Sequence, residues 1–150
     1  MVIIHDQKVN LTWVRQEIDN LKPLFEGYGK QIIAVYLFGS LAAGTETPLS
    51  DVDIAVLFDR DVDQRTIKYL EGDLFLKLSK QLRTDEIDLV VLNTAPPSIR
   101  YGVLRERRLL YYTDKSQVVD FEDQTILGYL DFKPYREEFD REFINGLAKR

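Results

Sequence analysis

The order of apolar patterns along the chain predicts an α/β (α+β) domain with a small mixed β-sheet packed with helices. Short runs rich in β-branched and aromatic residues, over 32–38, 51–58 and 86–92, predict strands. The segment 61–83 has apolar residues every three or four positions, which is the helical period. The alternation of the two patterns indicates one sheet covered by helices.

The remaining segments complete this arrangement. A helix is expected over 11–29, with Asn10 as its cap and an interruption at Pro23, because proline breaks a helix interior. The elements expected further on are a helical turn after Gly39, a loop over 44–50, a short helix over 98–107, a strand over 108–113 and helical structure from Ser116 onward. Residues 1–150 are therefore expected to form a single domain with a C-terminal helical tail.

Composition excludes several classes of function. Hydrophobic residues make up 45% of the 150 positions, enough for a core, and the formal charge of −5 disfavours a nucleic-acid duplex as the main partner. The chain has no cysteine, which excludes disulfides and cysteine zinc sites and fits a cytoplasmic protein. No apolar run approaches the ~20 residues of a membrane-spanning helix, so no membrane association is expected.

Two aspartates at the start of a buried strand are the first candidate functional residues. Asp51 and Asp53 are two positions apart, so in a strand their side chains share one face and repel each other. A hard cation such as Mg²⁺, which prefers carboxylate and phosphate oxygens, would offset this repulsion. The simpler alternative is that Ser50 and Asp51 only close a turn.

A second Asp-x-Asp pair, Asp61 and Asp63, serves as an internal control. It precedes a helical pattern, where acidic residues stabilise exposed N–H groups, and we assign it to helix capping. Only the first pair follows a Gly-Ser element, Gly39 and Ser40, directly after a buried strand. Such a turn offers N–H groups and a hydroxyl to a phosphate.

Asp88 is a third candidate carboxylate. It lies within the apolar segment 86–92, where Ile87, Leu89 and Val91 should face one side and Asp88 the other. A charged side chain inside such an apolar strand indicates a functional role. The alternative is an edge strand on which Asp88 is exposed.

These residues resemble a known family. Gly39-Ser40, a ten-residue spacer and Asp51-x-Asp53 match the signature of the minimal nucleotidyltransferases of the polymerase-β-like superfamily. The small size and the segments 100–114 and 121–139 resemble the MntA-type antitoxins of HEPN/MNT toxin–antitoxin pairs. That resemblance implies transfer of AMP from ATP to a tyrosine of a HEPN-domain RNase toxin, in a hetero-oligomer with it.

The resemblance also implies roles for the residues. Asp51, Asp53 and Asp88 are the expected catalytic and metal ligands for two Mg²⁺ ions, and Gly39 and Ser40 the expected nucleotide-binding residues. One departure is Ala43, where many family members carry Arg or Lys for the triphosphate. Arg105, Arg107 and Arg108 either form a solvated helix end or contact a partner, RNA or ATP.

Several alternatives remain open at this stage. The chain could modify a small molecule such as an aminoglycoside, although 150 residues leave little room for a separate acceptor pocket. It could also be a catalytically idle fold that neutralises a toxin by binding alone. The aromatic residues Tyr129, Phe132, Tyr135, Phe139 and Phe143 either pack on this domain or contact a partner.

Overall fold

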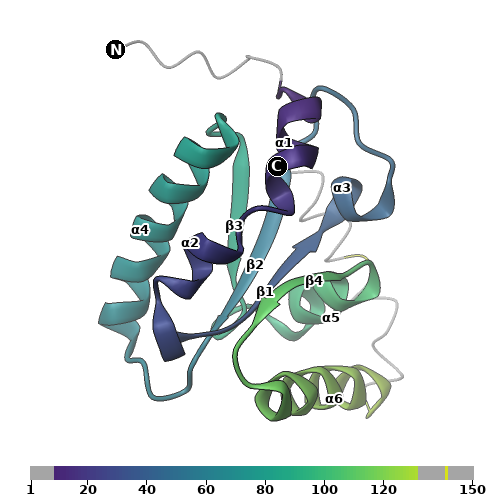
Figure 1. Ribbon diagram of the computed structural model, residues 1–150. Coiled ribbons are helices and arrows are strands. Elements are labelled where there is room, and N and C mark those ends of the chain that lie inside the picture. The colour runs from purple at the N-terminus through teal and green to yellow at the C-terminus, as the bar shows by residue number, and fades with distance from the viewer. Residues whose placement is uncertain (1–8, 132–140, 142–150) are drawn as a thin grey trace.

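The computed structural model describes residues 9–131 and 141 and has the predicted order of helices and strands (Figure 1). Its helices are α1 (Leu11–Ile18), α2 (Lys22–Glu26), α3 (Gly39–Ala43), α4 (Gln64–Leu82), α5 (Pro97–Arg105) and α6 (Lys115–Asp131), with a 3-10 turn over Gly29–Gln31. Its strands are β1 (Ile32–Phe38), β2 (Val52–Phe58), β3 (Ile87–Val91) and β4 (Arg108–Tyr112).

The four strands form one mixed sheet in the order β3-β2-β1-β4. β1 pairs antiparallel with β2 and with β4, whereas β2 and β3 are parallel and are joined through α4. This confirms the predicted fold class. Because of these directions, the end of β1 and the starts of β2 and β3 lie at the same end of the sheet.

Helices cover both faces of the sheet. Buried residues of α1, α2 and α4 form one core with the sheet face that carries Val35, Ile54 and Val56. Residues of α5 and α6 form a second core with the other face, which carries Tyr36, Ala55 and Leu57. Figure 1 shows the two groups of helices on opposite sides of the strands.

Local sequence explains where the helices begin and end. Pro23 lies in the first turn of α2, so the predicted helix over 11–29 is divided as expected. Asp63 caps α4 by accepting a hydrogen bond from the Thr66 amide at 2.8 Å, which confirms the capping role assigned to it. That bond and one from the Thr66 side chain lower the pKa of Asp63.

The helical tail is described as far as Asp131. Tyr129 stacks on Tyr101 with 3.6 Å between ring centroids, so this aromatic residue packs on its own domain. The predicted roles of Phe132, Tyr135, Phe139 and Phe143 fall outside the described residues. Among the helices described, none has both the length and the apolar character needed to cross a membrane.

Candidate functional site

Asp53 is a buried charged side chain at the start of β2. It is the second residue of the strand and is only 6% exposed. It lies on the face of the sheet that carries Ala55 and Leu57, and Asp51, immediately before the strand, is half-buried. Aspartate is rarely buried this deeply, which makes this end of the sheet the candidate site.

The register of the sheet brings Asp88 beside Asp53. The two residues are direct partners in the parallel pairing of β2 with β3, and adjacent strands are about 4.8 Å apart. Paired residues face the same side, and β3 alternates as predicted, with Ile87 and Val91 in one core and Leu92 in the other. β3 is an edge of the described sheet, but Asp88 is half-buried rather than fully exposed.

Gly39 closes the site from the end of β1. Its predecessor Phe38 is paired with Asp53, and its own φ is +71°, in the left-handed region that favours glycine. A Cβ added at Gly39 would lie 2.1 Å from Oδ2 of Asp53. The Asp53 carboxylate therefore occupies the space that any other residue at position 39 would need.

Ser40 lies in the first turn of α3, directly after Gly39. The N–H groups of a first helical turn have no partner within the helix, and the N-cap residue Phe38 offers no side-chain acceptor. Ser40 itself is half-buried. Backbone N–H groups and a hydroxyl thus lie at the same end of the sheet as Asp53.

An ion pair that the sequence did not predict fixes the loop between Ser40 and Asp51. Arg15 of α1 binds Glu46, near the middle of that loop. Hydrogen bonds from its own backbone and from Arg15 hold the pKa of Glu46 below its usual value. The two residues are 31 positions apart, and no local pattern connects them.

Ion pairs within the domain hold two of the clustered arginines, Arg107 and Arg108. Arg107 pairs with Glu122 of α6 at 3.3 Å, and Arg108 pairs with Asp19. Arg105 is exposed at the end of α5. Ala43, the position at which the resemblance led us to expect a basic residue, is exposed at the end of α3.

Among residues 9–131 and 141, no three His, Cys, Asp or Glu side chains are gathered as a preformed metal site. The register of the sheet places Asp53 beside Asp88. Convergence of Asp51 with these two residues stays a prediction.

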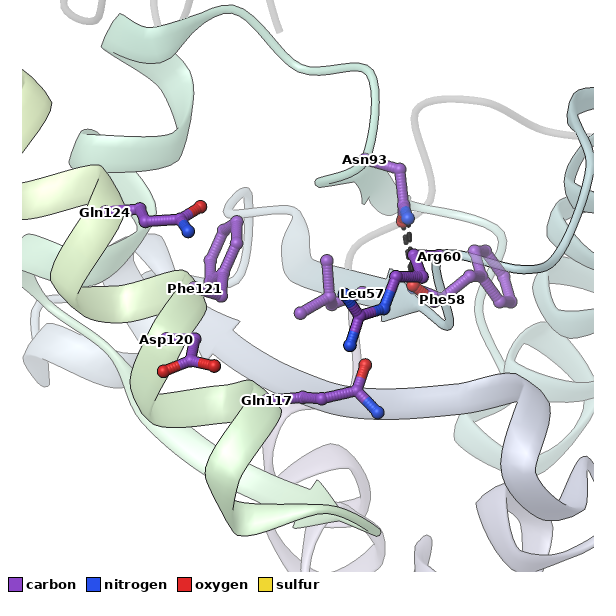
Figure 2. A pocket seen from close by; sticks show the side chains of 8 residues that line it. All are labelled: Leu57, Phe58, Arg60, Asn93, Gln117, Asp120, Phe121 and Gln124. Carbon is purple, nitrogen blue, oxygen red and sulfur yellow. Dashed lines mark hydrogen bonds between the residues drawn. The ribbon is translucent and has the colours of Figure 1, made fainter.

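A different cavity lies at the opposite end of β2 (Figure 2). It has a volume of about 200 Å³ and is lined by Leu57, Phe58, Arg60, Asn93 and four residues of α6. Asn93 is engaged there, because its side-chain amide exchanges two hydrogen bonds with the backbone of Phe58, at 2.8 and 2.9 Å. The cavity lies about 17 Å along the strand from Asp53, so it is not part of the candidate site.

The geometry at the start of β2 agrees with a family assignment. Residues 19–116, which include Gly39, Ser40 and all three aspartates, match the family model described as polymerase beta, nucleotidyltransferase. The chain belongs to this nucleotidyltransferase family. The matched segment contains the whole sheet and most of the helices around it.

Curated relatives of this nucleotidyltransferase have a more specific activity. It is 32% identical over 116 residues to the protein adenylyltransferase MntA of Shewanella oneidensis, covering 77% of this chain and 79% of the relative. It is 27% identical over 124 residues to MntA of Aphanizomenon flos-aquae, covering 76% and 79% of the two chains.

Solved structures resemble this nucleotidyltransferase in fold. One of them, described as a toxin–antitoxin with AMP-PNP, has a TM-score of 0.63 at 27% identity. The similarity covers 85% of this chain and 98% of the other. AMP-PNP is an analogue of ATP, so the neighbour binds the class of nucleotide that an adenylyltransferase uses.

Proposed function

We propose that this nucleotidyltransferase transfers AMP from ATP to a tyrosine hydroxyl of a HEPN RNase toxin and acts as the antitoxin of that pair. The family assignment supports nucleotidyl transfer, and the two relatives named protein adenylyltransferase MntA support AMP as the transferred group. The neighbour with AMP-PNP, itself a toxin–antitoxin, supports both ATP as donor and a toxin as partner.

One observation carries the proposal from this chain's own geometry. Asp53 and Asp88 are paired across parallel strands, and Gly39 lies against the Asp53 carboxylate. Three segments far apart in the sequence therefore supply two acidic groups and a phosphate-binding turn to one place. A domain that only bound a partner would not need this arrangement.

The chain's own residues then have separate tasks. The backbone of Gly39 and the hydroxyl of Ser40 bind the triphosphate and orient its α-phosphorus. The tyrosine oxygen attacks that phosphorus in line, a new O–P bond forms, and the bond to the β-phosphate oxygen breaks, releasing pyrophosphate. Asp88 accepts the proton of the attacking hydroxyl.

The donor groups fit magnesium. Carboxylates of Asp51, Asp53 and Asp88, together with phosphate oxygens, are the ligands that Mg²⁺ prefers. When bound, Mg²⁺ would neutralise phosphate charge and lower the pKa of the acceptor hydroxyl. We therefore propose Asp51, Asp53 and Asp88 as its ligands, with two ions as the expected number.

The test is AMP transfer to a cognate HEPN protein, measured as the intact mass of that protein after incubation with ATP. Asp53→Asn and Asp88→Asn keep the side-chain shape and should each abolish the mass increment. Asp61→Asn, in the second Asp-x-Asp pair, is the matched control and should transfer AMP like the parent chain. Full transfer by Asp53→Asn would overturn the proposal.

Protection of cells from the toxin, and the mass of an aminoglycoside incubated with the chain and ATP, separate the two other functions. If Asp88→Asn still protected cells from the toxin as well as the parent chain, neutralisation by binding alone would be the correct account. If only an aminoglycoside gained mass, the acceptor would be a small molecule.

A further inference from the structure

A groove beside Asp88 belongs neither to the nucleotide site nor to the cavity of Figure 2. It lies between α4 and β3, which are side by side in Figure 1, and has a volume of about 490 Å³. Gly72 and Phe75 of α4 form one wall, and Asp88 and Leu89 of β3 form the other. Asp88 is thus shared by the groove and the candidate active site.

Gly72 makes the groove wide. It lies in the interior of α4, where glycine is unfavourable by about 1 kcal/mol relative to alanine. A Cβ at this position would have no described heavy atom within 4 Å, so open space lies over the helix there. Glycine at position 72 therefore leaves the space over the helix open, although it lowers the stability of the helix.

Exposed apolar side chains continue the groove along the outer face of α4. Tyr69 is 71% exposed and Leu76 is 70% exposed. They precede and follow Gly72 by three and four residues, so all three share one side of the helix. Large apolar side chains that line up beside a groove are typical of a protein-binding surface.

We propose that this groove, defined by Gly72, Phe75, Asp88 and Leu89 with Tyr69 and Leu76 on its rim, binds the tyrosine-bearing segment of the partner protein. The proposal rests on the proposed function and adds where its acceptor docks. The tyrosine ring lies against Phe75 and Leu89 at the edge of β3, and its hydroxyl reaches around that edge to Asp88, whose side chain faces the other side of the sheet. Tyr69 and Leu76 contact apolar side chains next to that tyrosine.

The charges in the groove favour a protein segment over a nucleotide. Its ionisable side chains are Lys68, Glu71 and Asp88, one cation against two carboxylates. A polyphosphate would be repelled by this balance, whereas a neutral phenol donates its O–H to a carboxylate. The groove therefore suits the acceptor and not the donor.

The edge of β3 offers the segment backbone contacts as well. Glu86 accepts from the Val52 amide at 2.9 Å, and the Leu92 amide donates to Val56 at 2.8 Å. In a parallel pair, backbone groups alternate in direction along the strand, so those of Ile87 and Leu89 point away from β2. An extended acceptor segment could align along this edge.

The decisive variant is Gly72→Trp, which fills the groove from a position where an added Cβ meets no described atom within 4 Å. Its matched control is Gly128→Trp on α6, another helical glycine with no described atom within 4 Å of an added Cβ. We expect Gly72→Trp to lower AMP transfer to the partner by about tenfold or more, as for the centre of an interface. Its affinity for a fluorescent ATP analogue should stay within about twofold of the parent chain.

A second pair of variants gives the same test with exposed side chains that cannot affect folding through burial. Leu76→Glu should weaken binding of the partner and transfer to it, whereas Leu127→Glu, at a site 58% exposed on α6, should not. Equal transfer by Gly72→Trp and Gly128→Trp would overturn the docking site. So would a parallel loss of ATP affinity in Gly72→Trp, which would make the groove a nucleotide subsite. Failure of the parent chain itself to transfer AMP would overturn the proposed function instead.

Discussion

Replacement of Gly39 by alanine tests the geometry of the site most directly. The new Cβ would lie 2.1 Å from Oδ2 of Asp53, more than an ångström closer than ordinary van der Waals contact. The Asp53 carboxylate or the turn at Gly39 must therefore shift by about 1 Å, a displacement that can cost about 10²-fold in rate when it affects a reacting group.

The loss of folding stability in Gly39→Ala should be small compared with the total stability of the domain. Alanine at φ +71° costs about 1–2 kcal/mol of backbone strain, against a total stability of about 5–15 kcal/mol for a domain. Gly39→Ala should thus remain folded while its AMP transfer falls by about 10²-fold. Gly44→Ala is the matched control, because Gly44 has φ +76° and no described atom within 4 Å of an added Cβ.

The assay combines urea unfolding with the initial rate of AMP transfer. Both variants should lose free energy of unfolding through backbone strain, Gly39→Ala the more because its Cβ also displaces Asp53, and only Gly39→Ala should lose most of its rate. If Gly44→Ala lost as much rate as Gly39→Ala, contact with Asp53 would not be the cause. If Gly39→Ala kept the parent rate, the position of the Asp53 carboxylate would not matter for transfer.

Three further changes have defined outcomes. Asp63→Ala removes the cap of α4 and should lower the free energy of unfolding by about 1 kcal/mol in urea without changing AMP transfer. Asp63→Asn keeps the acceptor oxygen and loses only the charge, so it should lower the free energy of unfolding by less than Asp63→Ala. Burial and the neighbouring Glu122 raise the pKa of Tyr36 above the usual 10.0, so the phenol stays neutral in the folded state. The free energy of unfolding should therefore fall as pH rises above 10, because the unfolded state then loses this proton. Urea unfolding from pH 9 to pH 11 should show a less steep fall in Tyr36→Phe. Gly72→Ala adds a Cβ in open space and should raise the melting temperature, because its helix propensity is better by about 1 kcal/mol.

Local patterns in the sequence were sufficient for the strands and helices. The run over 32–38 became β1 without change, since a continuous β-branched and aromatic segment between turn residues has few other structures open to it. The two Asp-x-Asp pairs were also distinguished, because only one follows a Gly-Ser turn and the other precedes a helix. Asp63 is the helix cap that this distinction predicted.

Long-range contacts could not be predicted from the sequence. The alternation in β3 predicted which side Asp88 faces, but its register against Asp53 depends on how the whole of α4 packs. The pairing of Arg15 with Glu46, and of Arg107 with Glu122, joins residues that no periodicity connects. Gly72 gave no signal either, because an isolated glycine within a helical pattern does not reveal what lies over it.

The mixed topology of the sheet explains why the active-site residues gather at one end. An antiparallel partner places the end of β1 next to the start of β2, and a parallel partner places the start of β3 there too. If β3 were antiparallel to β2, the start of β3 would lie at the end of β2, beside the cavity of Figure 2 and far from Asp53. The long helix α4 makes the parallel connection possible, and the groove that we assign to the acceptor lies between that helix and β3. The same element therefore sets the position of the third carboxylate and shapes the surface that presents the hydroxyl to it.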